Sequence, residues 1–131
     1  MNKENHVLIA LQKLIEKNSV NLPNNFSQTF NFDDTEYVYM SEVDPHIDDW
    51  DGSETKWKIE FFYINPNYTF IYRLNGKLHK IKPELNRIYE FEFLKYHALL
   101  LDSNLENFHK RKFWKSWKNN QELSCIFQFI D

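Results

Sequence analysis

Residues 69–81 read TFIYRLNGKLHKI, and this stretch decides the fold class that the chain is expected to adopt. Two runs of alternating apolar and polar residues flank the dipeptide Asn75-Gly76. Asn-Gly accepts the positive φ angles of the two-residue turns that join antiparallel strands. The stretch therefore predicts a β-hairpin with strands at residues 69–74 and 77–81.

The same period of two recurs on both sides of the hairpin. It predicts further strands at residues 29–32, 37–43, 57–64, 87–93, 98–101 and 123–130. The aromatic share of 18% agrees with this prediction, because aromatic residues favour half-buried pleated surfaces. A barrel or jelly roll closes such a set of strands without leaving long exposed edges. We therefore expect a mainly β fold.

Two segments have the period of a helix instead. Apolar residues recur every three or four positions from residue 6 to 18, which predicts an N-terminal amphipathic helix. Leu105, His109, Phe113 and Trp117 lie four apart, which predicts a basic helix inserted before the last strand. Its aromatic stripe has helical spacing, which favours packing onto the barrel. Aromatic residues among basic ones can also bind nucleic acid, but the acidic charge of the whole chain argues against this. The expected organisation is one domain, 1–131, with the first helix and a linker at 1–25 and the β-barrel at 26–131.

Composition excludes several classes of protein. Only two glycines are present, so the chain lacks the Gly-rich loops of phosphate-cradling and dinucleotide folds. The lone Cys125 excludes an internal disulfide framework and fits a reducing compartment. Neither a signal peptide nor an apolar run of membrane-spanning length is present. We therefore expect a cytoplasmic protein with no membrane partner.

The net charge of −3 is unevenly distributed. No Lys or Arg occurs between Lys17 and Lys56, and the acidic residues of this interval are concentrated at residues 44–54. Such a run is usually a solvated loop, although clustered carboxylates can also bind Ca²⁺. An acidic loop can also cover a basic surface on another protein. Residues 44–54 are therefore the candidate contact for a macromolecular protein partner.

One group of residues has the chemistry of a metal site. Residues i and i+2 of a strand face the same side, so a strand at His46-Ile47-Asp48 would direct an imidazole and a carboxylate to one place. His97 begins another predicted strand and could supply a third ligand. Two histidines and one carboxylate are the ligand set of non-haem Fe(II) sites, which keep open positions for dioxygen and a co-substrate.

The order of these features resembles that of the 2-oxoglutarate-dependent oxygenases and the wider double-stranded β-helix (cupin-like) superfamily. The resemblance covers about residues 37–130. The shared features are, in chain order, His46-Ile-Asp48, an aromatic strand ending at Pro66, the hairpin, the turn at Pro83, His97 and a last strand. The resemblance implies a double-stranded β-helix or jelly-roll barrel. It also implies Fe(II) bound by His46, Asp48 and His97, and an oxidation that uses dioxygen and 2-oxoglutarate.

The chain departs from the pattern of this superfamily in two places. Asn86 replaces the usual Gly in the turn before the sixth strand, a mild change because Asn also tolerates positive φ. In the family an Arg or Lys near the last strand binds the carboxylate of oxoglutarate. Residues 119–124 read NNQELS and contain neither. The sequence therefore supports the metal site more than it supports the use of oxoglutarate.

Three functional classes remain open from the sequence. The first is a small Fe(II)-dependent oxygenase-like protein that acts on a small molecule or a protein, with Tyr63, Tyr72, Tyr89 and Phe91 as candidate substrate-binding residues. The second is a non-enzymatic module that binds a protein through its acidic loop, such as an immunity protein or a phage-borne inhibitor. The third is a sugar- or metabolite-binding barrel without metal.

Overall fold

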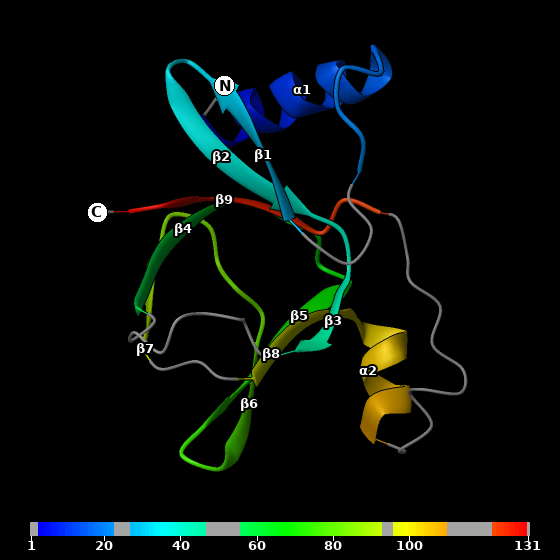
Figure 1. The fold of residues 1–131 in the computed structure, drawn as a ribbon, viewed down its shortest axis with the longest axis vertical. Coiled ribbons are helices and arrows are strands. Elements are labelled where there is room, and N and C mark those ends of the chain that lie inside the picture. Colours follow the sequence, from blue (N-terminus) through cyan, green and yellow to red (C-terminus); the bar gives the residue numbers. More distant parts are fainter. Residues whose placement is uncertain (1–2, 23–26, 47–55, 93–95, 110–121, 131) are drawn as a thin grey trace.

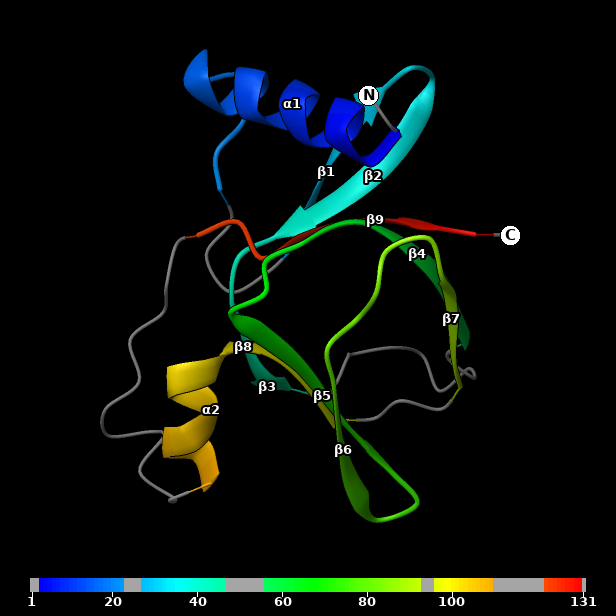
Figure 2. The same ribbon diagram turned by 180° about the vertical axis from the view of Figure 1, so that it is seen from behind.

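The computed structural model describes residues 3–22, 27–46, 56–92, 96–109 and 122–130. These residues form two antiparallel sheets and two short helices, so the molecule is mainly β (Figures 1 and 2). The elements are α1 (Lys3–Glu16), β1 (Ser27–Phe32), β2 (Thr35–Met40), β3 (Val43–His46), β4 (Lys56–Ile64), β5 (Tyr68–Leu74), β6 (Lys77–Ile81), β7 (Ile88–Glu92), β8 (Tyr96–Leu101), α2 (Asp102–His109) and β9 (Cys125–Phe129). Neither α1 nor α2 combines the length and the hydrophobicity that a membrane crossing requires.

The two sheets combine strands that are far apart in the chain. One sheet has five strands in the order β1-β2-β9-β4-β7, and the other has four in the order β3-β8-β5-β6. Neighbouring strands are antiparallel throughout. The C-terminal strand β9 lies between β2 and β4, and β8 lies between β3 and β5. Both sheets therefore depend on long-range pairing, which local sequence cannot specify alone.

Two strand connections are tight turns with positive φ angles. β5 and β6 are joined at Asn75 (φ 52°) and Gly76 (φ 78°). Two consecutive positive φ angles are the pattern of a type I′ turn, whose twist matches that of the flanking strands. β1 and β2 are joined in the same way by Asp33 (φ 53°) and Asp34 (φ 61°). The predicted hairpin is therefore confirmed, and a second one precedes it.

The main core lies between the two sheets. Phe61 of β4 and Phe127 of β9 project from the five-stranded sheet, with ring centroids 5.7 Å apart. From the other sheet, Phe70 of β5 reaches Phe91 of β7 at 5.3 Å, and Leu99 of β8 lies in the same cluster. Burying side chains of this size contributes about 1.5–3 kcal/mol each. This shared aromatic layer holds the two sheets face to face.

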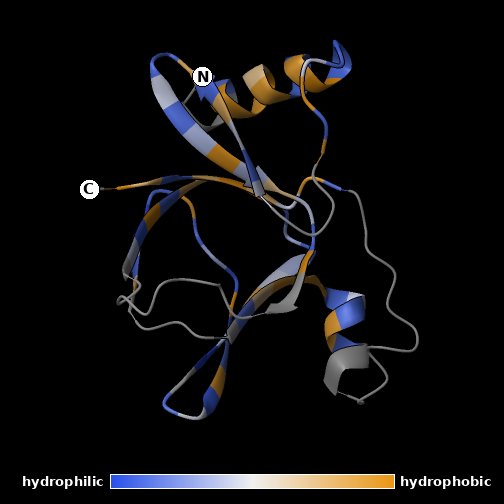
Figure 3. Cartoon of the chain, in the orientation of Figure 1, coloured by the Kyte–Doolittle hydropathy of each residue, from blue (hydrophilic) through white to orange (hydrophobic). Residues whose placement is uncertain are grey.

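Helix α1 covers the outer face of the five-stranded sheet. Val7 and Leu11 are fully buried against Tyr37, Tyr39 and Phe62. They are four residues apart, so they lie on one face of the helix. Hydrophobic residues recur along the length of α1 (Figure 3). The N-terminal helix predicted from the sequence is therefore confirmed.

Helix α2 covers the outer face of the four-stranded sheet, where Leu105 packs near Leu100. A buried carboxylate fixes its first turn. Glu42 accepts hydrogen bonds from Asn104 Nδ2 on both oxygens, at 2.9 and 2.8 Å, and from the backbone N–H of Leu101 at 2.9 Å. Because Glu42 is completely buried, water does not compete for these bonds. They tie the corner between β2 and β3 to the start of α2.

The structure differs from the sequence-based expectation at two elements. The predicted strand at 37–43 is divided into β2 and β3, separated by the buried pair Ser41-Glu42. The chain passes from one sheet to the other at this point, so one alternating run serves both sheets. The predicted helix at 105–118 begins earlier, at Asp102, and its second half lies outside the described residues.

Gly76→Ala should lower the free energy of unfolding by about 1 kcal/mol, because a Cβ disfavours the left-handed conformation of the turn. No other described residue comes within 4 Å of the added Cβ, so the cost is conformational. Urea unfolding measures the change. Lys77→Ala, at the neighbouring exposed position, should stay within about 0.5 kcal/mol of the native protein. Equal losses in the two variants would contradict this explanation.

Asn104→Ala should lower the free energy of unfolding by about 1.5–3 kcal/mol, the usual contribution of hydrogen bonds to a charged group. The variant leaves the buried Glu42 carboxylate with fewer donors. Ser103→Ala, at an exposed position of the same helix, is the matched control and should be nearly neutral. Chemical denaturation of both variants would show whether the buried bonds account for the difference.

Candidate functional site

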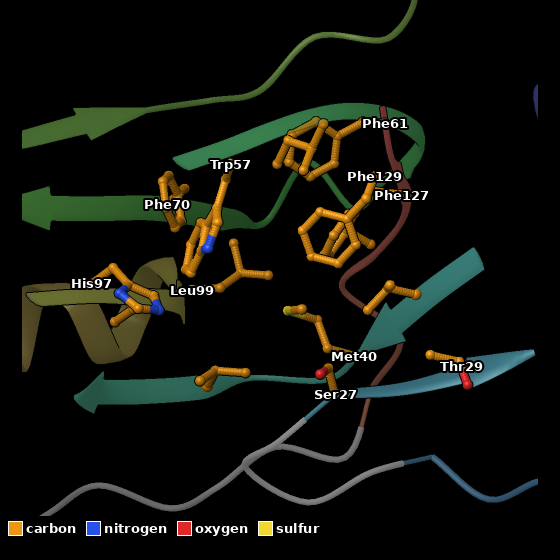
Figure 4. A pocket seen from close by; sticks show the side chains of 15 residues that line it. Ser27, Thr29, Met40, Trp57, Phe61, Phe70, His97, Leu99, Phe127 and Phe129 are labelled. Atoms are coloured by element: carbon orange, nitrogen blue, oxygen red, sulfur yellow. The ribbon is translucent and has the colours of Figure 1, made fainter. Parts of the chain in front are cut away.

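A pocket of about 520 Å³ lies between the two sheets (Figure 4). Strands β1, β2, β4 and β9 supply one wall, and β3, β5 and β8 supply the other. The residues that line it are Ser27, Thr29, Val38, Met40, Val43, Trp57, Ile59, Phe61, Phe70, His97, Ala98, Leu99, Cys125, Phe127 and Phe129. The volume is within the range of about 300–1,000 Å³ that is typical of small-molecule sites.

The described lining of this pocket is almost entirely apolar. Ser27, Thr29, His97 and Cys125 are its only members with a hydroxyl, imidazole or thiol group, and none is Asp, Glu, Lys or Arg. Figure 4 shows His97 at one end, near Trp57, and Thr29 at the other. The site therefore presents one imidazole, two hydroxyls and one thiol to a largely hydrophobic space.

His97 is held in the pocket by its position on β8 and by aromatic neighbours. Alternation along β8 directs His97 and Leu99 to the pocket and Leu100 to the outer cluster near α2. The Trp57 ring meets the imidazole edge to face, with centroids 4.8 Å apart and planes at 88°. Phe70 lies farther off, at 6.4 Å. The side chain is only 7% exposed, so packing restricts its orientation.

His46 ends β3 and is the register partner of His97 on β8. Directly opposed residues of an antiparallel pair have Cβ atoms about 4.5–5.5 Å apart. The register shifts between Val43, paired with Leu99, and His46. Pro45 falls within this irregular stretch of an edge strand, where a missing N–H donor is tolerated. The fold thus brings together the two histidines that the sequence singled out.

The third predicted ligand, Asp48, lies outside the described residues, as does most of the acidic run at 44–54. Within the described part of the chain, no cluster of three His, Cys, Asp or Glu residues has the geometry of a metal site. Binding of Fe(II), of Ca²⁺ or of a protein partner by this region therefore stays a prediction.

Three of the four aromatic residues expected at the site belong to the core cluster beside the pocket. Tyr72 of β5 is the register partner of His97, and its ring lies 5.4 Å from that of Phe91. Tyr89 stacks on Phe91 at 6.1 Å and meets Phe61 at 5.8 Å. These rings pack against lining residues in the core cluster, but they do not line the pocket themselves.

Tyr63, the fourth, packs on the α1 side of the five-stranded sheet. The register of β4 and β9 shifts between Phe61, paired with Phe127, and Tyr63, paired with Ile126. Strict alternation would place Tyr63 on the same face as Phe61, and the bulge reverses this. Burial, with a smaller contribution from the Glu122 carboxylate, raises the pKa of the Tyr63 hydroxyl.

Sequence reasoning missed several aromatic residues of the pocket wall. Trp57 and Phe61 of β4, and Phe127 and Phe129 of β9, alternate with residues that face away. Their spacing marks one face of each strand, but not which face turns inward. Phe70 is the register partner of Leu99, and both line the pocket from the four-stranded sheet.

Cys125 is buried in the pocket wall and behaves as a core residue. Its alternation with Leu123 and Phe127 favours that role over the role of a nucleophile. Burial raises the pKa of its thiol to about 12, against a smaller opposing effect of a hydrogen bond with Ser124. The thiolate is the reactive form, so the folded protein holds this side chain neutral and unreactive.

Iodoacetamide should label Cys125 slowly in the native protein at about pH 8 and rapidly in urea, because only the unfolded chain forms the thiolate readily. The unfolded thiol ionises near its ordinary pKa of 9.0 and the folded one near 12. Its contribution to stability is therefore present at neutral pH and is lost as the pH rises through this interval. Mass spectrometry follows the labelling, and fast labelling of folded protein would contradict the prediction.

Comparison with known proteins found no matching family model, no matching curated protein and no matching solved structure. The functional assignment therefore rests on the geometry of the pocket and on the His46–His97 register.

Proposed function

We propose that the β-strands form a double-stranded β-helix, or jelly roll. The strand pairings support this, because they are nested: β5 pairs with β6, β4 with β7, β3 with β8, and β2 with β9. In these pairs the first four strands fold back on the last four, as the two arms of one long hairpin do. The additional pairs β4·β9 and β5·β8 roll it into two sheets. Eight strands in two facing sheets are typical of the jelly roll.

A detail of one turn agrees with the same proposal. Asn86, which replaces the glycine usual before the sixth strand of the superfamily, has a φ of 61°. Asn is one of the few residues other than Gly that adopt this left-handed conformation readily. The substitution therefore preserves the turn.

We propose that this protein binds a mononuclear metal ion, Fe(II), through His46, Asp48 and His97, and oxidises a small molecule with dioxygen. The observation that carries the proposal is the pairing of His46 with His97 on adjacent strands, with His97 in the wall of the pocket. Asp48 follows His46 by two residues, the spacing that returns a side chain to the same face of an extended chain.

The residues around His97 suit the needs of such a site. When bound, Fe(II) with two histidines and one carboxylate retains open positions at which dioxygen is activated. Trp57 packs on the edge of the imidazole and restricts its rotation, as residues around metal ligands commonly do. The largely apolar walls offer water few hydrogen-bond partners in the space in front of His97.

We do not extend the proposal to oxoglutarate. Binding of a dicarboxylate requires a cationic partner, commonly Arg or Lys. The pocket residues contributed by β9 are Cys125, Phe127 and Phe129, and none of the described lining residues is basic. The reducing equivalents for the oxidation are therefore assigned to the substrate itself or to a separate reductant.

The native protein, purified without a metal-affinity tag, should contain or take up one Fe(II) per chain, with Mn(II) as an air-stable substitute. His46→Ala and His97→Phe should each weaken metal binding by roughly 100-fold or more, because each removes a side chain that would coordinate the metal directly. Phenylalanine retains a ring for Trp57 to pack against, which separates loss of a ligand from loss of packing. Elemental analysis and titration calorimetry measure the result.

His79→Phe is the matched control. His79 lies on β6 in the same register row as His97, and its ring stacks on that of Tyr72, with centroids 5.0 Å apart and planes at 10°. Metal affinity should be unchanged in this variant. A native protein that binds none of Fe, Mn, Ni or Zn, or a His46→Ala variant with native affinity, would overturn the proposed site.

A further inference from the structure

We infer that the pocket between the sheets binds an uncharged, largely apolar small molecule. Binding requires only the pocket, whereas the oxidation of that molecule rests on the metal site proposed above. The inference therefore names the class of substrate for the proposed reaction, and it can be tested without any metal.

The size of the pocket is the first argument. Protein interiors are close-packed and contain few voids larger than a water molecule. Here about 520 Å³ remains open between two sheets, beside the contact that Phe70 makes with Phe91. A space of this size that is walled by strands of both sheets has the character of a ligand site and not of a packing defect.

The absence of acidic residues and of Lys and Arg from the described lining is the second argument. A charged ligand that enters an apolar space must lose its hydration and gain a partner of opposite charge in return. None of the described lining residues is Asp, Glu, Lys or Arg. The Cys125 thiol stays protonated in the folded protein, since burial raises its pKa to about 12. The walls therefore select for neutral molecules.

The distribution of side chains along the pocket indicates how such a molecule would lie. His97 and Trp57 occupy one end, and Phe127, Phe129 and Thr29 occupy the other (Figure 4). Phe129 is 57% exposed, and its ring meets that of Phe127 edge to face with centroids 5.4 Å apart. These two rings form an aromatic rim at this end of the pocket. An elongated apolar molecule would enter past this rim and present its far end to His97.

Two dyes with one aromatic framework provide the test. N-phenyl-1-naphthylamine is uncharged, and 8-anilino-1-naphthalenesulfonate carries a sulfonate on the same rings. The uncharged dye should bind the native protein with a stoichiometry of one and about tenfold or more tighter than the sulfonate, because the described lining offers the sulfonate neither Lys nor Arg. Dye fluorescence in the metal-free protein measures both affinities.

Thr29→Trp tests the location. Thr29 is exposed on the edge strand β1 and lines the pocket, so an indole at this position would fill the entrance and weaken dye binding by about tenfold. Asn31→Trp adds the same ring two positions further along β1, outside the lining, and should leave the affinity unchanged. Circular dichroism verifies folding, and Ser27→Trp, at another exposed lining position, replaces Thr29→Trp if that variant does not fold.

The possible results separate the two proposals. No binding of the uncharged dye, equal binding of both dyes, or equal effects of Thr29→Trp and Asn31→Trp would each overturn the inference. Dye binding by a protein that binds no metal would leave the inference standing and remove the proposed oxidation. Metal binding without dye binding would do the reverse.

Discussion

The register of β8 against its two neighbours determines which side chains meet at the His97 end of the pocket. It sets His97 opposite His46 on β3 and opposite Tyr72 on β5. Alternation then directs Leu99 into the pocket and Leu100 to the outer face. A slip of one residue would reverse every one of these side chains and move the imidazole out of the pocket. The pocket and the pairing of the two histidines therefore both depend on the register of β8.

Contacts at the end of β8 hold that register in place. The Leu101 N–H donates to the buried Glu42 carboxylate at 2.9 Å. At the next residue, the Asp102 carboxylate accepts from Thr69 Oγ1 at 2.7 Å and from Lys82 Nζ at 2.8 Å. The Lys82–Asp102 ion pair is half exposed and contributes at most about 1 kcal/mol. The buried bonds of Glu42 are therefore the stronger restraint on the junction between β8 and α2.

Two irregularities in strand pairing decide which side chains meet in the pocket. The shift in β3 separates Val43, which lines the pocket, from His46, the partner of His97. The shift in β4 leaves Phe61 in the core and turns Tyr63 toward α1. Bulges are frequent next to binding sites, where they redirect a side chain without breaking the sheet.

The sequence by itself determined the class of the fold and most of its elements. The hairpin at Asn75-Gly76, the helical period after residue 6 and the alternating runs depend on local physics: backbone φ preferences and the periods of helix and strand. His46 and His97 were recognisable as a pair worth testing because each is a possible metal ligand and Asp48 follows His46 at the spacing of one strand face.

Only the tertiary structure decided which residues form the site. Periodicity identifies the two faces of a strand, but the choice of the inward face depends on partners far away in the chain. Trp57 and Phe127 line the pocket because β4 pairs with β9, across 68 residues from Glu60 to Gln128. Tyr63 faces α1 because a bulge shifts its register, a feature that no local pattern specifies. Long-range pairing is a property of the whole chain, so the pocket and the proximity of His46 to His97 appear only in the folded molecule.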